Sequence, residues 1–300
     1  MKSLILFIGI NILLFSVSLG NNGKNKTLKN KKLEEIIKFP VHAFHLKKIK
    51  IQNLNIKKIN YDKHERNYYL ICKNPNFSDY KRVIFYVHGG GWILGKPENH
   101  LKLAEILSEQ GFIVVLPAYR YAYQAQGTEM VEDLKKAYQS ACTEIKNDYP
   151  NIEGVIIGGA SAGGNLASLI ALSDLPSIFP IKGLFSLSGV LDLSEIKENL
   201  IIKMFAKEPQ SSHYQALNPI NFLHSSQNQF PILCIHGTKD ALVPLCSSTN
   251  FVEIAQTKTC HPIDFFYFEA NHIDITSAWY YDTTKNYGQK ELLIAWLLSL

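Results

Sequence analysis

The sequence contains few cysteines, and none is spaced with histidine in the way that a metal site requires. Its 300 residues include five cysteines, at positions 72, 142, 234, 246 and 260. Because five is odd, in an oxidising compartment at least one thiol stays free or pairs between chains. Cys246 and Cys260 flank a predicted helix and could form a bridge, whereas Cys234 lies in a predicted core strand. We therefore expect neither a bound metal nor a disulfide-dense scaffold.

Long hydrophobic runs are also absent, apart from one near the start of the chain. A lysine precedes the nearly apolar stretch Leu4–Leu14, and small residues follow at Ser18–Gly20. This layout predicts a cleaved secretory signal over residues 1–20, and hence a secreted or cell-envelope protein. An uncleaved membrane anchor is the alternative, but it needs about 20 apolar residues. No cysteine lies near the cleavage region, which argues against a bacterial lipid anchor.

Positive charge is concentrated in one segment. Residues 24–58 hold eleven lysines against Glu34 and Glu35, so residues 59–300 are net acidic although the whole chain carries +5. We interpret residues 21–46 as a solvated basic arm, with weak contact to an anionic surface as the alternative. No basic patch is interleaved with aromatic residues, so we expect no nucleic-acid partner.

A glycine-framed serine follows one of the most apolar strands. Residues 158–164 read Gly-Gly-Ala-Ser-Ala-Gly-Gly, directly after Val155–Ile157, and residues 165–172 are typical of a helix. A strand, a Gly-x-Ser-x-Gly turn and a helix together form a nucleophile elbow. Glycine has no Cβ to block such a tight turn. The pattern predicts that Ser161 is a nucleophile at the carboxyl edge of a sheet.

A second glycine run supplies candidate hydrogen-bond donors. His88–Trp92 reads His-Gly-Gly-Gly-Trp and follows the apolar strand at residues 83–87. Backbone N–H groups in such a loop can stabilise the oxyanion of a tetrahedral intermediate. We assign the donors to Gly90 and Gly91, with Gly89 shaping the turn. The N–H of Ala162 would complete this oxyanion hole.

An acid and a base follow two later strands. Asp240 comes just after the strand at residues 230–236, and His272 lies in the loop after the strand at residues 263–268. The chain order Ser161, Asp240, His272 is that of an α/β-hydrolase. In this arrangement the histidine takes the serine proton and the aspartate fixes the tautomer of the imidazole.

Other titratable residues are candidates for the same roles. Asp192 is a rival acid, but it follows a strand that is one too early in the chain. Glu269 is too close to His272 in sequence to orient it. His88 and His236 adjoin the predicted site, and we interpret both as structural or supporting residues.

The paired motifs resemble those of a known family. His88–Trp92, residues 159–164 and the order of the three catalytic candidates are similar to the hormone-sensitive-lipase-type and BD-FAE-like carboxylesterases of the α/β-hydrolase superfamily. The resemblance covers roughly residues 80–300. It implies a mostly parallel eight-stranded sheet with helices on both faces and a small cap, within a catalytic domain at residues 47–300. We place the cap at about residues 190–230.

The resemblance also implies hydrolysis of short- or medium-chain esters, without a metal or organic cofactor. A small-molecule ester is then the expected partner. Two segments depart from the usual pattern of the family, residues 118–123 and residues 237–244. The second is more similar to relatives that cleave feruloyl or acetyl esters, formamides or peptides. Amide, peptide or formamide hydrolysis on the same residues is therefore an alternative, and a catalytically silent binding protein is an alternative of another class.

Overall fold

The computed structural model describes residues 50–173, 175–224, 229–279 and 287–300. The predicted signal (1–20) and basic arm (21–46) lie outside the described residues. In chain order the elements are β1 (Asn55–Asn60), β2 (Tyr68–Lys73), β3 (Arg82–Val87), η2 (Pro97–His100), α3 (Leu101–Glu109), β4 (Phe112–Pro117), α4 (Gly127–Asp148), β5 (Gly154–Ala160), α5 (Ala162–Leu172), β6 (Ile181–Leu187), η3 (Leu193–Glu195), α6 (Leu200–Ala206), α7 (Ser212–Gln215), η4 (Pro219–Phe222), β7 (Ile232–Gly237), α8 (Cys246–Lys258), β8 (Ile263–Phe268), α9 (His272–Thr276) and α10 (Gln289–Ser299).

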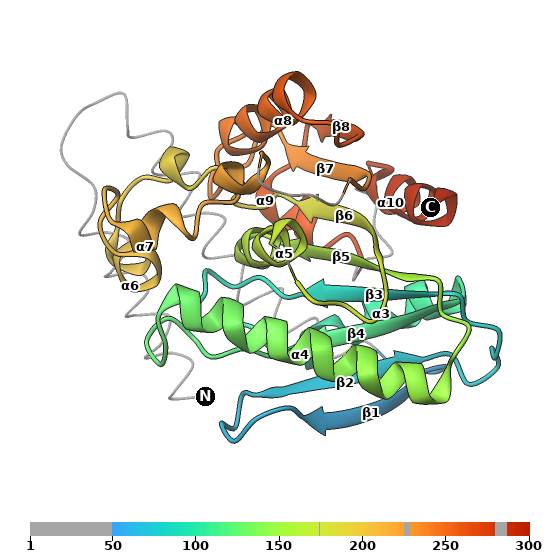
Figure 1. Cartoon of the computed structure of the whole chain (residues 1–300). Coiled ribbons are helices and arrows are strands. Elements are labelled where there is room, and N and C mark those ends of the chain that lie inside the picture. The colour runs from blue at the N-terminus through green and yellow to red at the C-terminus, as the bar shows by residue number, and fades with distance from the viewer. Residues whose placement is uncertain (1–49, 174, 225–228, 280–286) are drawn as a thin grey trace.

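The strands form one twisted sheet of the predicted kind (Figure 1). Its eight strands lie in the order β1-β2-β4-β3-β5-β6-β7-β8. The pairs β1–β2 and β2–β4 are antiparallel, and every other neighbouring pair is parallel. The mostly parallel eight-stranded sheet is thus confirmed. Of the two N-terminal strands, only β1 lies at the edge of the sheet, since β2 pairs on both sides.

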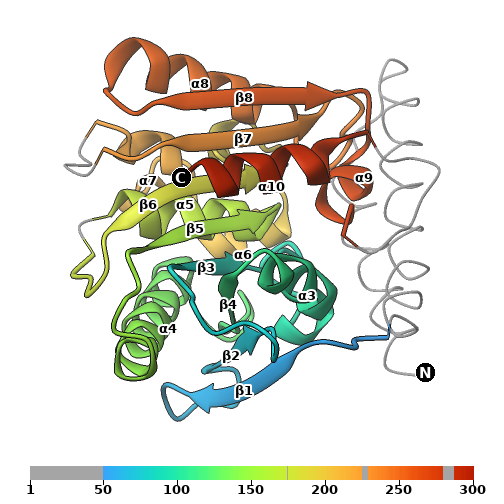
Figure 2. The same ribbon diagram turned by 90° about the vertical axis from the view of Figure 1, so that its right-hand side faces the viewer.

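Helices cover both faces of the sheet, so the central strands are buried on both sides (Figures 1 and 2). One core lies between the sheet and α4, α5 and α8, and the other between the sheet and α3, α9 and α10. Strand β3 serves both: Phe85 and Val87 point into the first core, and Ile84 and Tyr86 into the second. Side chains alternate along a strand, so a doubly covered strand reads as a continuous apolar run.

The segment between β6 and β7, predicted as a cap at about residues 190–230, is called the cap below. It contains η3, α6, α7 and η4. The side chain of Asn199 caps α6 by accepting hydrogen bonds from the N–H groups of Ile201 and Ile202. Phe205 on α6 stacks on Trp92 with ring centroids 4.3 Å apart. This contact joins the cap to the loop that follows β3.

All five cysteines are free thiols. The bridge considered between Cys246 and Cys260 does not form, because Cys246 begins α8 and Cys260 follows its end. At about 1.5 Å of rise per residue, this 13-residue helix separates them by roughly 20 Å, well beyond the reach of a disulfide. Cys234 is buried in β7, as expected. Within the described ranges, no helix has both the length and the apolar character needed to cross a membrane.

Candidate active site

Ser161 lies in the tight turn that the sequence predicts, between β5 and α5. Its backbone has φ +56° and ψ −127°, a strained conformation for a residue that carries a Cβ. The N–H of Ser161 donates to the carbonyl of Leu187 at 3.0 Å, and its own carbonyl accepts from the N–H of Gly164 at 2.9 Å. The helix begins at Ala162, three residues earlier than expected. Ser161 is therefore held at the N-terminus of α5, and it remains partly exposed.

The glycines beside Ser161 allow the backbones to come very close together. A Cβ on Gly159 would lie 2.4 Å from the carbonyl oxygen of Gly163. A Cβ on Gly163 would lie 2.2 Å from the carbonyl oxygen of Val87 at the end of β3. Since real Cβ atoms do not approach oxygen so closely, only glycine fits at either position. These contacts bring α5 against the start of the glycine loop.

The glycine loop at residues 88–95 lies directly beside Ser161. A Cβ on Gly89 would be 3.1 Å from the Cβ of Ser161. Gly90 and Gly91 have φ values of +126° and +57°. Among the described residues, the N–H groups of Gly90, Gly91 and Ala162 donate no hydrogen bond to another part of the chain. They are therefore available to a ligand.

Asp240 and His272, which are far apart in sequence, are hydrogen-bonded partners. The Nδ1 atom of His272 lies 2.7 Å from the Oδ2 atom of Asp240, and both side chains are buried. The other carboxylate oxygen accepts from the N–H groups of Leu242 and Val243, at 2.9 and 2.8 Å. His272 was expected in a loop, but it is the first residue of α9, because Asn271 caps this short helix. The carboxylate thus fixes the imidazole by a bond to Nδ1.

A second histidine supports the acid. The Nε2 atom of His236 lies 3.0 Å from the carbonyl oxygen of Val243 and 3.5 Å from Oδ2 of Asp240, and its Nδ1 atom pairs with the hydroxyl of Ser248 at 2.7 Å. Burial alone would raise the pKa of Asp240, but the opposing effects of His272, His236 and the Val243 N–H keep that pKa below its ordinary value. His236 is the supporting residue that we expected, whereas the contribution of Ser248 has no local signal in the sequence.

Asp192, the rival acid, has a structural role instead. Its carboxylate accepts hydrogen bonds from Ser194, Asn218 and Asn250, which join η3, the start of η4 and α8. Glu269 forms an ion pair with Lys239 at 2.7 Å on the surface. Neither carboxylate is therefore placed to compete with Asp240 for His272.

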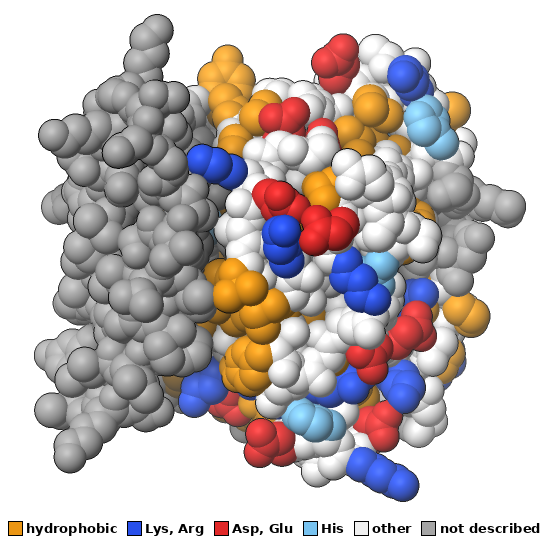
Figure 3. Space-filling view, turned by 90° about the vertical axis from the view of Figure 1, so that its left-hand side faces the viewer, with side chains coloured by type: hydrophobic (Ala, Val, Ile, Leu, Met, Phe, Trp, Pro, Cys, Tyr) orange, Lys and Arg blue, Asp and Glu red, His pale blue; other side chains and the backbone are white. Residues whose placement is uncertain are grey.

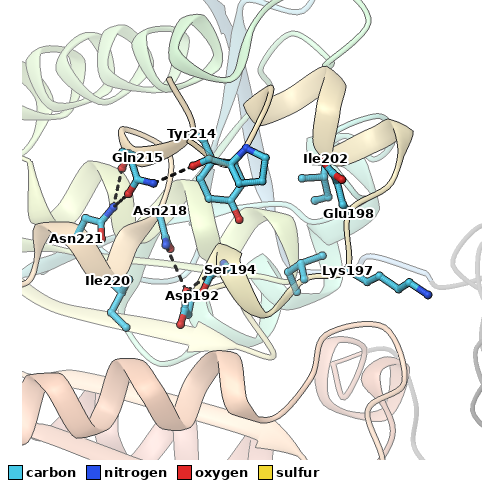
Figure 4. A pocket seen from close by; sticks show the side chains of 12 residues that line it. Asp192, Ser194, Lys197, Glu198, Ile202, Tyr214, Gln215, Asn218, Ile220 and Asn221 are labelled. Carbon is cyan, nitrogen blue, oxygen red and sulfur yellow. Dashed lines mark hydrogen bonds between the residues drawn. The ribbon is translucent and has the colours of Figure 1, made fainter. Parts of the chain in front are cut away.

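A cavity of about 600 Å³ lies within the cap (Figure 4). It is lined from η3, α6, α7 and η4, by Asp192, Ser194, Ile196, Lys197, Glu198, Ile202, Pro209, Tyr214, Gln215, Asn218, Ile220 and Asn221. Ser161, Asp240 and His272 do not line it. Much of its polar lining is internally paired, since Asp192 binds Ser194 and Asn218, and Gln215 binds Asn221. The cavity is thus distinct from the elbow.

Charge on the cap side of the molecule is mixed. Figure 3 shows acidic and basic side chains interspersed over the described part of this face, with hydrophobic side chains gathered between them. Such a surface favours no ligand of a single charge. In the part of the chain that the structure describes, no group of three or more His, Cys, Asp or Glu side chains could hold a metal ion.

Three histidines near the site should make the fold sensitive to acid. Burial lowers the pKa of His100 to about 4, and it also lowers the pKa values of His88 and His236. In the unfolded chain such rings bind a proton below about pH 6.5, whereas in the folded state they stay neutral until the pH is lower. Unfolding therefore takes up protons, and we expect each histidine to lower the free energy of unfolding by ~1.4 kcal/mol per pH unit between pH 6.5 and its folded pKa.

Urea unfolding at pH values from 7.5 to 4.5 measures this effect. Replacing His100 with Asn should reduce the slope of the free energy of unfolding against pH by the contribution of one histidine, ~1.4 kcal/mol per pH unit. A free energy of unfolding that is constant down to pH 4.5 would contradict the assignment of these rings as neutral.

Comparisons with known proteins identify the family and the fold of the chain. The BD-FAE family model matches residues 71–254. Over 199 residues the chain is 26% identical to the probable carboxylic ester hydrolase LipM of Mycobacterium tuberculosis, covering 60% of this chain and 46% of that protein. It is 32% identical over 117 residues to the kynurenine formamidase of Salmo salar, covering 38% of each. The chain thus spans less than half the length of these two curated relatives.

Among solved structures, the chain is similar to inhibited esterase B from Lactobacillus rhamnosis. The TM-score is 0.73 at 15% sequence identity, over 91% of this chain and 94% of that one. Identity this low shows the fold alone. The predicted α/β-hydrolase fold is therefore confirmed.

Proposed function

Because the chain belongs to the BD-FAE family, we propose that it is a serine hydrolase that cleaves short- or medium-chain carboxylic esters through an acyl-enzyme. The observation that carries this proposal is the bond of 2.7 Å between Asp240 and His272. It accompanies a strained serine that lies against a glycine loop with available N–H groups. Each feature has an ordinary structural explanation alone, but acyl transfer needs all of them together.

The proposed reaction starts with proton transfer from Ser161 to Nε2 of His272. The Oγ atom of Ser161 attacks the ester carbonyl, and the resulting oxyanion accepts hydrogen bonds from the N–H groups of Gly90, Gly91 and Ala162. The imidazolium then gives its proton to the departing alcohol, which leaves an acyl group on Ser161. Water, activated by the same imidazole, releases the acid and restores the serine.

Asp240 has two functions in this scheme. Its bond to Nδ1 of His272 keeps the proton of the neutral ring on that nitrogen, so that Nε2 is the nitrogen that accepts from serine. Its negative charge stabilises the imidazolium that forms. The depressed pKa of Asp240 supports this role, because the carboxylate stays ionised in its buried position.

Initial rates across a substrate panel test the proposal. We expect turnover of p-nitrophenyl acetate, butyrate and hexanoate, with the N-formyl amide of an arylamine cleaved more slowly, because an amine is a poorer leaving group than a phenol. Rates with acyl chains of increasing length and with a feruloyl ester then identify the acyl group that the enzyme prefers. No turnover of any ester by folded protein would contradict the proposal.

Formamide hydrolysis is the second candidate. It is favoured by the 32% identity to kynurenine formamidase over 117 residues. The same three side chains and the same oxyanion donors would serve it, because a formamide also reacts through a tetrahedral intermediate. Faster cleavage of the formamide than of every ester in the panel would favour this candidate over the first.

A further inference from the structure

Arg66 lies outside the two glycine motifs and yet binds the segments around the glycine loop. It belongs to the turn between β1 and β2 and precedes the part of the chain that the family model matches. Its Nε atom donates to the carbonyl of Tyr119 at 2.7 Å, and its Nη2 atom donates to the carbonyl of Gly95 at 3.2 Å. The guanidinium also lies over the ring of Tyr121, 3.7 Å from the centroid. Arg66 thus ties an N-terminal turn to the end of the glycine loop.

The guanidinium also reaches the first residue of that loop. Its Nη2 atom is 3.5 Å from Nε2 of His88, and Nδ1 of His88 is 2.8 Å from the carbonyl oxygen of Gly89. A guanidinium only donates and a carbonyl only accepts. Burial keeps the pKa of His88 well below its usual range, with smaller contributions from His100 and then Arg66, so the ring is neutral. Its single proton is therefore on Nδ1, and Nε2 presents its lone pair to Arg66.

The hydrogen bond from Nδ1 of His88 to the Gly89 carbonyl fixes the orientation of the peptide plane between Gly89 and Gly90. No cis peptide occurs in the described chain, so the N–H of Gly90 points away from the Gly89 carbonyl. With that carbonyl held by the imidazole, the N–H faces the opposite side. Gly95 packs against the same carbonyl, since a Cβ on Gly95 would lie 2.3 Å from the oxygen. Both contacts resist rotation of a peptide whose glycine residues would otherwise allow it.

We propose that Arg66 is a positioning residue for the oxyanion hole. By donating to Nε2 of His88 and to the Gly95 carbonyl, it selects the tautomer that holds the Gly89 carbonyl and so directs the Gly90 N–H at the oxyanion. This proposal rests on the proposed function, because it assigns Gly90 to the stabilisation of a tetrahedral intermediate. Arg66 itself touches neither substrate nor reacting atoms.

The test compares Arg66→Met with the parent enzyme in two measurements. Both depend on an oxyanion that binds in the same hole. One is kcat and KM for p-nitrophenyl butyrate, and the other is the inhibition constant of an alkyl trifluoromethyl ketone, which adds to serine and forms a stable oxyanion. Removing one oxyanion donor costs about 10²–10³ in kcat. Because Arg66→Met loosens a donor rather than removing it, we expect kcat to fall ~10- to 100-fold. The ketone should bind more weakly by a similar factor, with KM changed less than ~3-fold.

Arg120→Met is the matched control, because it is the same substitution at another partly buried arginine. Arg120 is a partly buried arginine of the segment after β4, and it pairs with Asp133 at 2.8 and 2.9 Å rather than with the glycine loop. Its substitution should lower stability in urea while leaving kcat and the ketone inhibition constant unchanged.

A double-mutant cycle with His88→Asn separates tautomer selection from simple anchoring. An asparagine amide can donate to the Gly89 carbonyl without help from Arg66. Arg66→Met should then have a smaller effect in the His88→Asn background than in the parent.

The outcomes distinguish failure of the positioning role of Arg66 from failure of the proposed function. Arg66 is an anchor and not a positioning residue if Arg66→Met lowers only the stability of the fold. The same holds if the variant lowers kcat without weakening the binding of the ketone. Full additivity with His88→Asn also overturns the tautomer argument. If the parent enzyme itself neither hydrolyses esters nor binds the ketone, the proposed function fails instead.

Discussion

Replacing Ser161 with alanine should lower kcat for p-nitrophenyl butyrate by about 10⁴-fold or more. The variant keeps the glycine loop and the Asp240–His272 pair, so only the attacking oxygen is lost. Folding should be unaffected, because alanine has the same Cβ as serine at φ +56° and adds no strain. The measurement is the turnover of a purified variant whose urea unfolding curve matches that of the parent enzyme.

Ser173→Ala is a suitable control for this substitution. Ser173 lies at the other end of α5, where its hydroxyl donates to the carbonyl of Ile170 at 2.9 Å. Its loss should leave kcat within about twofold of the parent value, since the hydroxyl bonds to a carbonyl at the opposite end of the helix from Ser161. Parent-like turnover by folded Ser161→Ala would contradict the covalent mechanism.

Replacing Asp240 with asparagine should lower kcat by roughly 10³- to 10⁴-fold. The backbone N–H groups of Leu242 and Val243 both donate to one side-chain oxygen at this position. An asparagine would keep its oxygen there and turn its NH₂ group toward Nδ1 of His272. That nitrogen would have to become an acceptor, which moves the ring proton to Nε2 and prevents it from taking the serine proton.

Asp192→Asn is the matched control for the acid, because it is the same substitution in the rival position. Asp192 receives its hydrogen bonds from Ser194, Asn218 and Asn250, so its loss should loosen the cap and lower stability. We expect kcat to fall far less than in Asp240→Asn. A larger loss of kcat in Asp192→Asn than in Asp240→Asn would contradict the assignment of the acid to Asp240.

Much of the central sheet could be predicted from the sequence, because its signals are local. Strand β3 is apolar from Val83 to Val87 since helices cover both of its sides, and β5 ends in a glycine pattern that few structures other than an elbow require. Strand β8 has the predicted bounds. The order of Ser161, Asp240 and His272 along the chain then predicts that their segments follow strands of one sheet, and they follow β5, β7 and β8.

The supporting contacts could not be predicted, because they depend on tertiary placement. Arg66 precedes His88 by 22 residues and meets it only once β2, β4 and β3 have paired. The hydroxyl of Ser248 reaches His236 only because α8 packs beside β7. The start of α9 at His272 depends on capping by Asn271, a signal that sequence reasoning overlooked. The cavity within the cap likewise follows from the packing of short helices.

The central claim is that Ser161 is an activated nucleophile. Its most direct test is mass spectrometry of the tryptic peptide that contains residue 161, after the enzyme reacts with a fluorophosphonate. The account predicts one phosphonyl group per molecule, carried by Ser161, with no labelling of Ser161→Ala. An unlabelled but folded parent enzyme, or a label on a different serine, would contradict it.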